Sequence, residues 1–163
     1  MFHRNKAKGF SLIELLIVVA IILIIAAIAI PNLLRSRIAA NEASAVGSIR
    51  TINTAEVTYS STYPDCGFTS LTNLGGSGGN TTGAGLIDAV LAGGTKSGYS
   101  FATTVAGGGG QCGSGTGTPN STFTVTGAPL NAQTGQRYFF SDQSGVIRYN
   151  NSTTATNTDA PLQ

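Results

Sequence analysis

The sequence predicts an α+β chain in which a long N-terminal α-helix, with a protruding apolar first half, packs on a small antiparallel β-sheet of about four strands. Three observations lead to this prediction. Residues 10–30 are almost wholly apolar, and apolar residues then recur at helical spacing up to Tyr63. The last hundred residues are rich in Gly, Thr, Ser and Asn and contain short β-branched segments, which is typical of strands joined by turns.

The apolar run over residues 10–30 predicts a membrane-spanning helix. As a helix it measures roughly 30 Å, which is enough to cross the hydrocarbon core of a bilayer. It lacks the polar face of a soluble core helix. The basic residues Arg4, Lys6 and Lys8 precede it, so we expect the N-terminus in the cytoplasm and the C-terminal region outside. A secretory signal peptide fits less well, because its apolar core is shorter and no small-residue cleavage site follows here.

Four segments follow from these patterns: a basic leader (1–9), an apolar helix half (10–30), an amphipathic helix half (31–63) and a Gly/Ser/Thr-rich head (64–163). Pro31 divides the two helix halves and marks a kink or a place where the helix melts. On the second half, one helical face carries a stripe of apolar residues, while most polar residues, Ser48 among them, fall elsewhere. The stripe consists of Leu34, Ile38, Ala45, Ile49, Ile52, Tyr59 and Tyr63.

Within the head, alternating or β-branched segments predict four strands, at residues 99–105, 121–126, 137–141 and 146–149. The last two strands form a hairpin around Gly145. Apolar residues between 86 and 91 suggest one short helical turn. The tail from residue 150 to 163 has no apolar pattern, so it either frays or adds to a sheet edge.

Composition excludes several classes of function. Nine basic and seven acidic residues become six and seven without Arg4, Lys6 and Lys8, so the net charge without the leader is −1. No basic surface for nucleic acid is therefore expected. The single histidine is His3, so a chain that starts at Phe10 contains none. This excludes histidine-based catalytic triads and histidine-ligated metal sites, and we predict no enzyme activity, no metal and no cofactor.

Glu14 is an anomaly within the apolar run. A carboxylate in hydrocarbon costs at least a few kcal/mol unless it is paired or protonated. One interpretation places Glu14 near the membrane interface, where it reaches the headgroups. The other is that Glu14 awaits a cation that another chain supplies.

The segment from Lys8 to Ile22 resembles the N-terminus of type IV pilins of the short-leader class, which are related to the pseudopilins of type II secretion. The resemblance consists of a basic leader, a Gly9–Phe10 junction, Glu14 four residues after it, and an apolar run that ends at Pro31. The phrase from Gly135 to Arg148 is similar to the late strands of these families.

The resemblance implies that a prepilin peptidase cleaves between Gly9 and Phe10 and N-methylates Phe10. Glu14 is then the assembly residue, which pairs with the Phe10 amine of a neighbour or of its own chain. The implied precursor is a single-pass inner-membrane protein with a cytoplasmic N-terminus. An inner-membrane assembly platform and an ATPase then build a homo-oligomeric helical filament, an extracellular pilus for adhesion, motility or DNA uptake.

A pseudopilin of a type II secretion system is the alternative that the resemblance leaves open. The major pseudopilin normally carries a C-terminal acidic calcium loop, and we find no such cluster in the sequence.

Cys66 and Cys112 fall on the side of the membrane where disulfides form, so we predict that they pair and close the Gly-rich segment between them. Four asparagines begin Asn-x-Ser/Thr sequences, which the abundance of these residues alone can produce. They are Asn80, Asn120, Asn150 and Asn151.

Overall fold

A computed structural model describes residues 9–108 and 118–162 of the chain. The leader residues 1–8 and Cys112 therefore lie outside the described residues. The chain divides into two units, residues 1–36 and residues 37–163, and each is described by itself.

The long N-terminal helix is confirmed as α1, which spans Leu12–Thr62. The helix continues through Pro31. Proline removes one N–H donor, and the turns on either side keep theirs, so one proline does not by itself end a helix of this length. Melting of the helix at Pro31 during assembly stays a prediction.

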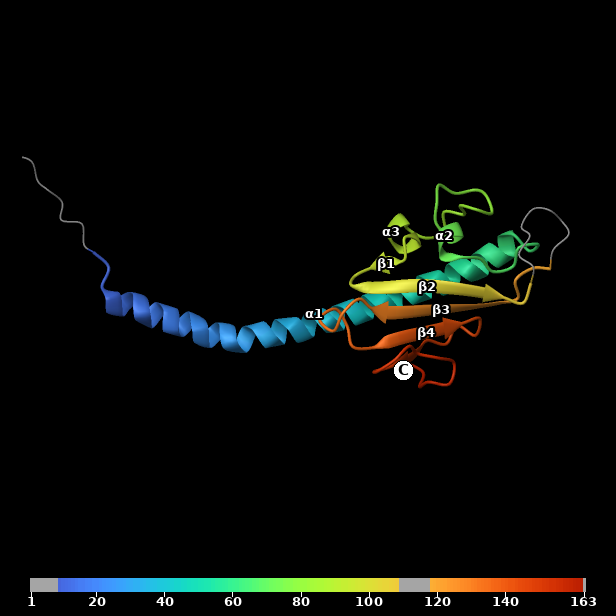
Figure 1. Cartoon of the computed structure of the whole chain (residues 1–163). Coiled ribbons are helices and arrows are strands. Elements are labelled where there is room, and N and C mark those ends of the chain that lie inside the picture. Colours follow the sequence, from blue (N-terminus) through green and yellow to red (C-terminus); the bar gives the residue numbers. More distant parts are fainter. Residues whose placement is uncertain (1–8, 109–117, 163) are drawn as a thin grey trace, which may run out of the picture. The chain divides into compact units, whose positions relative to one another are not determined.

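The C-terminal part of the chain forms one antiparallel sheet with the strand order β1-β2-β3-β4-β5 (Figure 1). The predicted meander is confirmed, and its four strands are β2 to β5; the additional strand, β1, is only two residues long. The strands are β1 (Thr95–Lys96), β2 (Tyr99–Ala106), β3 (Thr122–Pro129), β4 (Tyr138–Asp142) and β5 (Arg148–Asn150).

Two short helices, α2 (Leu71–Leu74) and α3 (Ala89–Ala92), lie in the connection between α1 and the sheet. The predicted helical turn corresponds to α3. No sequence pattern predicts α2, because four residues are too few to show a helical period.

The C-terminal tail adds to the β5 edge of the sheet. The Tyr149 N–H donates to the Ala160 carbonyl (3.1 Å), and the Leu162 N–H donates to the Ile147 carbonyl (2.7 Å). Of the two predicted alternatives, edge addition is therefore correct. The tail covers backbone groups of β5 that an edge strand otherwise leaves unpaired.

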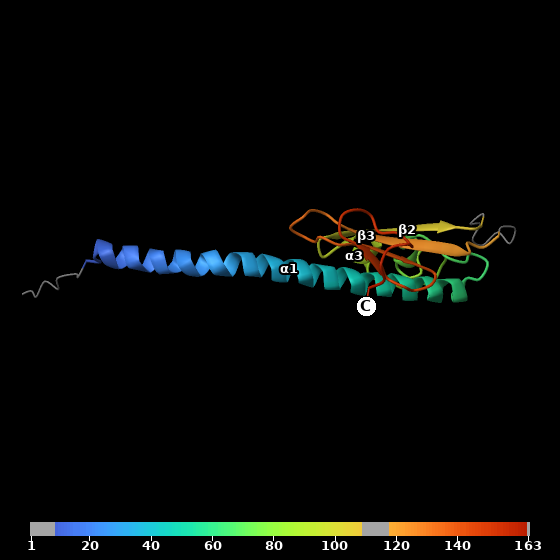
Figure 2. The ribbon, with the colours of Figure 1, turned by 90° about the horizontal axis from the view of Figure 1, so that it is seen from below.

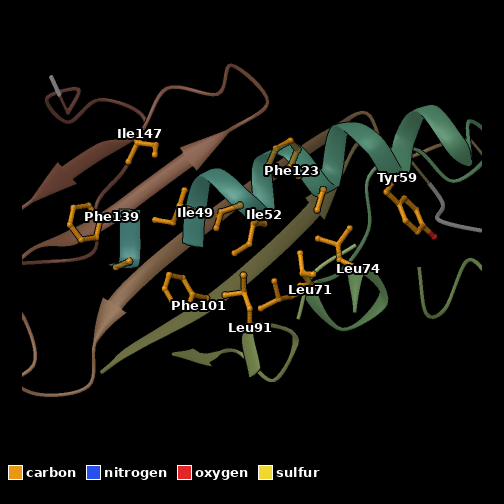
Figure 3. Close-up of a cluster of buried hydrophobic side chains, with 14 of the residues drawn as sticks. Ile49, Ile52, Tyr59, Leu71, Leu74, Leu91, Phe101, Phe123, Phe139 and Ile147 are labelled. Carbon is orange, nitrogen blue, oxygen red and sulfur yellow. The ribbon is translucent and has the colours of Figure 1, made fainter. Parts of the chain in front are cut away.

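The hydrophobic core lies between the sheet and the second half of α1 (Figures 2 and 3). Four residues of the predicted stripe are buried, as are large side chains from β2, β3 and β4. Ser48, which we expected away from this face, is also buried, since a side chain of its size fits beside the isoleucines. The central members are Ala45, Ile49, Ile52, Tyr59, Tyr99, Phe123, Val125 and Phe139.

Two glutamates complete the buried face of α1. The predicted stripe contains two steps of seven residues, from Ile38 to Ala45 and from Ile52 to Tyr59, and Glu42 and Glu56 occupy the helical positions in between. Both glutamates are buried. The buried face therefore follows an unbroken alternation of three- and four-residue steps from Glu42 to Tyr59.

Glu42 joins α1 to the segment that precedes β4. Its Oε1 accepts hydrogen bonds from the backbone N–H groups of Gln136 (3.0 Å) and Arg137 (3.3 Å). Its Oε2 lies 3.0 Å from Nε of Arg137, whose guanidinium also lies over the Tyr149 ring. The buried charge of Glu42 is thus compensated by an ion pair and two backbone donors.

Glu56 has fewer partners. Its Oε2 accepts a hydrogen bond from the Thr69 N–H (3.0 Å), whereas its Oε1 is buried with no hydrogen-bond partner among the described residues. Burial raises the pKa of the Glu56 carboxyl to about 7, although the Thr69 hydrogen bond lowers it in part. Because the folded-state pKa lies above the ordinary value, the contribution of Glu56 to stability is fully present below pH 4.5 and is lost as the pH rises through about 7.

We predict that Glu56→Gln stabilises the folded chain above pH 7 by up to about 3 kcal/mol, because the amide keeps the acceptor for Thr69 without a buried charge. The gain should shrink as the pH falls toward 4.5. The free energy of unfolding is measurable in detergent by near-UV circular dichroism of the tyrosines, since the chain contains no tryptophan.

The matched control is Glu42→Gln, which should destabilise the chain at neutral pH because it removes the ion pair with Arg137. A gain from Glu56→Gln that stays constant between pH 4 and 8 would contradict the raised pKa.

Candidate processing and assembly site

The Gly9–Phe10 junction lies outside regular structure, just before α1. The Phe10 side chain is 84% exposed, and no heavy atom lies within 4 Å of the position that a Cβ would take at Gly9. Exposed, non-helical backbone of this kind is where proteases act. The junction that the sequence predicts as a cleavage site is therefore accessible in the folded chain.

Glu14 helps to begin α1. Its Oε2 accepts a hydrogen bond from the Ser11 backbone N–H (2.9 Å), and the Ser11 carbonyl accepts the first helical bond from the Leu15 N–H (3.3 Å). A glutamate that reaches back from the third helical position to the N–H of the N-cap residue is one half of a capping box. The sequence analysis missed this contact, although the Ser-x-x-Glu spacing at residues 11–14 is its signature.

The cap turns the Glu14 carboxylate toward the start of the chain that cleavage would produce. The backbone nitrogen that would become the new amine belongs to Phe10, one peptide unit from the Ser11 N–H. Within residues 9–108 and 118–162, the second oxygen of Glu14, Oε1, has no hydrogen bond. The arrangement therefore leaves one carboxylate oxygen for a cation.

The large apolar side chains of α1 up to Leu34 are exposed, from 46% at Val19 to 79% at Leu12. The most apolar stretch of this helix has a mean hydropathy of 3.3, and none of it is buried, so it is long and apolar enough to cross a membrane. One side of the helix carries a shallow apolar groove lined by Leu12, Leu15, Leu16, Val19, Ala20 and Leu23. This surface fits membrane anchoring.

Cys66 is buried at the opposite end of α1 and lies beside the segment that follows residues 109–117. The Asn120 N–H donates to the Cys66 carbonyl (3.0 Å), and the Phe68 N–H donates to the Asn120 carbonyl (3.1 Å). Gly67 has a positive φ of 68° and lies against the Asn120 backbone, where a Cβ would not fit. These contacts hold Cys66 near the chain that leads out of the segment containing Cys112, and the pairing of the two cysteines stays a prediction.

The N-terminal segment is similar to segments of known proteins. A family profile described as the prokaryotic N-terminal methylation motif matches residues 4–30. Over 38 residues the chain is 69% identical to the "Type IV wide pilus major component PilA4" of Thermus thermophilus. The matched residues make up 23% of this chain and 29% of that protein. Over 54 residues it is 44% identical to the "Type IV major pilin protein PilA" of Myxococcus xanthus. The matched residues make up 33% of this chain and 24% of that protein. No solved structure matches.

These matches cover less than a third of the length of either relative. The structure itself shows an α+β architecture with a long N-terminal apolar helix and an antiparallel sheet. Its N-terminal segment matches the N-terminal methylation motif and is similar to the corresponding segments of these two pilus proteins.

We predict that neither cysteine of the native chain reacts with an alkylating agent until the protein is reduced, because the two form a disulfide. On the loop-entropy model, a bridge around a segment of this length contributes about 3–4 kcal/mol, so Cys66→Ala and Cys112→Ala should each lower stability by that amount. Intact-mass measurement before and after reduction checks the bridge. Two alkylated thiols without prior reduction would show that it is absent.

Proposed function

We propose that this chain is a structural subunit that is cleaved between Gly9 and Phe10, N-methylated at Phe10 and polymerised into a type IV pilus on the cell surface. The observation that carries the proposal is the position of Glu14. Its carboxylate accepts a hydrogen bond from the N–H of Ser11, the residue after Phe10, at the start of a helix with exposed apolar side chains. A building block needs no catalytic group of its own, and we propose that the chain is not an enzyme.

The exposed apolar surface favours assembly with further copies. Residues 12–34 of α1 present large aliphatic side chains that the rest of the described chain leaves exposed. At ~25 cal/mol per Å², even half-burying such helices against one another contributes tens of kcal/mol of gross hydrophobic stabilisation before association costs. Leaving the membrane gains less, because lipid is itself apolar. We therefore infer that an inner-membrane platform and an ATPase drive the extraction.

Glu14 can set the register of an incoming subunit. Cleavage creates a positive α-amine at Phe10, and methylation keeps that charge. In a filament core without water, a carboxylate or an amine that loses its partner costs roughly 3–5 kcal/mol, so a subunit that aligns the two charges is strongly preferred. The hydrogen bond to Ser11 holds Glu14 in place, and the second carboxylate oxygen is then available to the amine of a neighbour.

A pseudopilin of a type II secretion system is not favoured over a pilin. The two relatives that match the N-terminal segment are described as a major pilus component and a major pilin.

We predict that Glu14→Gln and Glu14→Ala both leave a cleaved, membrane-resident chain but reduce filaments about a hundredfold, because the charge pair is lost. The glutamine variant is the sharper test. It keeps an acceptor for the Ser11 N–H, so it separates the helix cap from the charge. The measurement is the amount of the chain in sheared surface fibres, together with electron microscopy. Normal fibres from Glu14→Gln would refute the charge-pairing role.

We also predict that Gly9→Val blocks processing, because a branched side chain then stands next to the bond to be cleaved. The chain itself has room for the change, so the effect reports on the peptidase and not on folding. Intact mass should show the nine-residue leader retained, which adds about 1 kDa at the chain average of 16.5 kDa for 163 residues.

The control for Gly9→Val is Gly47→Ala, since Gly47 is another glycine with open space around it and lies far from the junction. It should be processed normally. A cleaved and methylated Gly9→Val product would disprove the assigned cleavage site.

A further inference from the structure

The structure distinguishes among the four Asn-x-Ser/Thr sequences, because each asparagine has different surroundings. Attachment of a sugar to asparagine needs an accessible side-chain amide with a hydroxyl residue two positions later. The amide nitrogen, Nδ2, must also be free to form a new bond.

In two of the four asparagines, Nδ2 already donates a hydrogen bond within the folded chain. Asn120 Nδ2 donates to the Phe68 carbonyl (2.9 Å), and Asn150 Nδ2 donates to Asp159 Oδ1 (2.9 Å). Both side chains are only partly exposed. Glycosylation at either position would break a contact that holds the segment beside Cys66 or the C-terminal tail.

Asn80 is exposed, and its Nδ2 makes no hydrogen bond within the described residues. Its Oδ1 accepts hydrogen bonds from both the backbone N–H and the hydroxyl of Thr82, each at 3.0 Å. The amide and the hydroxyl that an acceptor sequence requires are therefore next to each other on the surface. The Tyr59 hydroxyl donates to the Thr81 carbonyl (2.6 Å), which ties this turn to α1.

Asn80 lies on an exposed turn, which the Gly83 N–H closes by donating to the Asn80 carbonyl (3.3 Å). Gly78 and Gly79 precede it with positive φ angles of 87° and 95°, and Gly83 follows two residues after Thr81. No heavy atom lies within 4 Å of a Cβ position at Gly79. The turn therefore presents the Asn80 side chain to a transferase, while the hydrogen bonds of Tyr59 and Gly83 hold its backbone in place.

Asn151 is also exposed, but its surroundings differ. Its neighbour Asn150 accepts hydrogen bonds from the N–H groups of Ser152 (3.0 Å) and Thr153 (3.3 Å) and also holds Asp159. Within the described residues, no hydrogen bond joins the Asn151 side chain to the Thr153 hydroxyl, so the amide and the hydroxyl are not paired there as they are at Asn80.

We propose that Asn80 is an acceptor for N-linked glycosylation. The donor is a sugar activated through a diphosphate. Nδ2 forms a bond to the sugar C1, the bond between C1 and the phosphate oxygen breaks, and a proton passes from Nδ2 to a base of the transferase. This modification does not depend on polymerisation, so it can be tested whether or not the chain forms a filament.

Trypsin makes the test specific, because it cuts after Arg50 and Lys96 and the peptide of residues 51–96 contains Asn80 but none of the other three asparagines. The full chain is purified from its native cells, reduced, alkylated and digested, and fragmentation locates any added mass. We expect a sugar on Asn80. An unmodified peptide, or a sugar found only on a serine or threonine hydroxyl, would overturn the proposal.

Variants separate the sequence requirement from folding. Asn80→Gln and Thr82→Ala should abolish the added mass completely, whereas Thr82→Ser and the control Asn151→Gln should retain it. Added mass that persists in Thr82→Ala would also overturn the proposal. Inhibiting the synthesis of polyprenyl-diphosphate sugars identifies the donor: loss of the sugar indicates a lipid-linked donor, and its persistence indicates a nucleotide sugar, with Asn80 the acceptor in both cases.

Discussion

The exposed apolar surface of α1 is the constraint on which the rest of this structure depends. Side chains such as Leu12 and Leu33 are more than two-thirds exposed. Soluble monomers rarely expose such a surface to water, and it fits membrane anchoring. Glu14 is tolerated at the start of this surface because the helix cap uses one of its oxygens. The cap thus fixes the Glu14 carboxylate at the first turn of α1.

The second half of the same helix packs against the sheet. There it supplies one wall of the head's core, and its buried face includes Glu42 and Glu56 as well as aliphatic residues. Glu42 is compensated by Arg137 and backbone donors, whereas Glu56 has a single backbone partner among the described residues. One buried acid therefore fastens the sheet to the helix, and the other makes the stability of the head depend on pH.

Local patterns predict the fold well where they repeat. Periodicity predicts the helix, the β2–β5 meander and the core residues Ala45, Ile49 and Ile52. In each of these elements, apolar residues recur at the spacing of a helix or a strand. The elements that were missed, β1 and α2, are too short to repeat. At the candidate site, Gly9, Phe10 and Glu14 belong to one local motif, so spacing alone singles them out. The contact of Glu14 with Ser11 was not predicted. Glu14 was considered only with respect to the membrane interface or a cation from another chain, although the Ser-x-x-Glu spacing is that of a common helix cap.

The sequence alone determined which part of the chain is helix, which part is sheet, and that an acid lies in an apolar segment, since these are properties of neighbouring residues. Only the tertiary structure decided that the seven-residue gaps in the apolar stripe are filled by buried glutamates and that the tail pairs with β5. It also decided that Asn80 differs from the other three candidate asparagines. The burial of Glu42 depends on Arg137, a partner far away in the sequence, and a local pattern contains no information on distant partners.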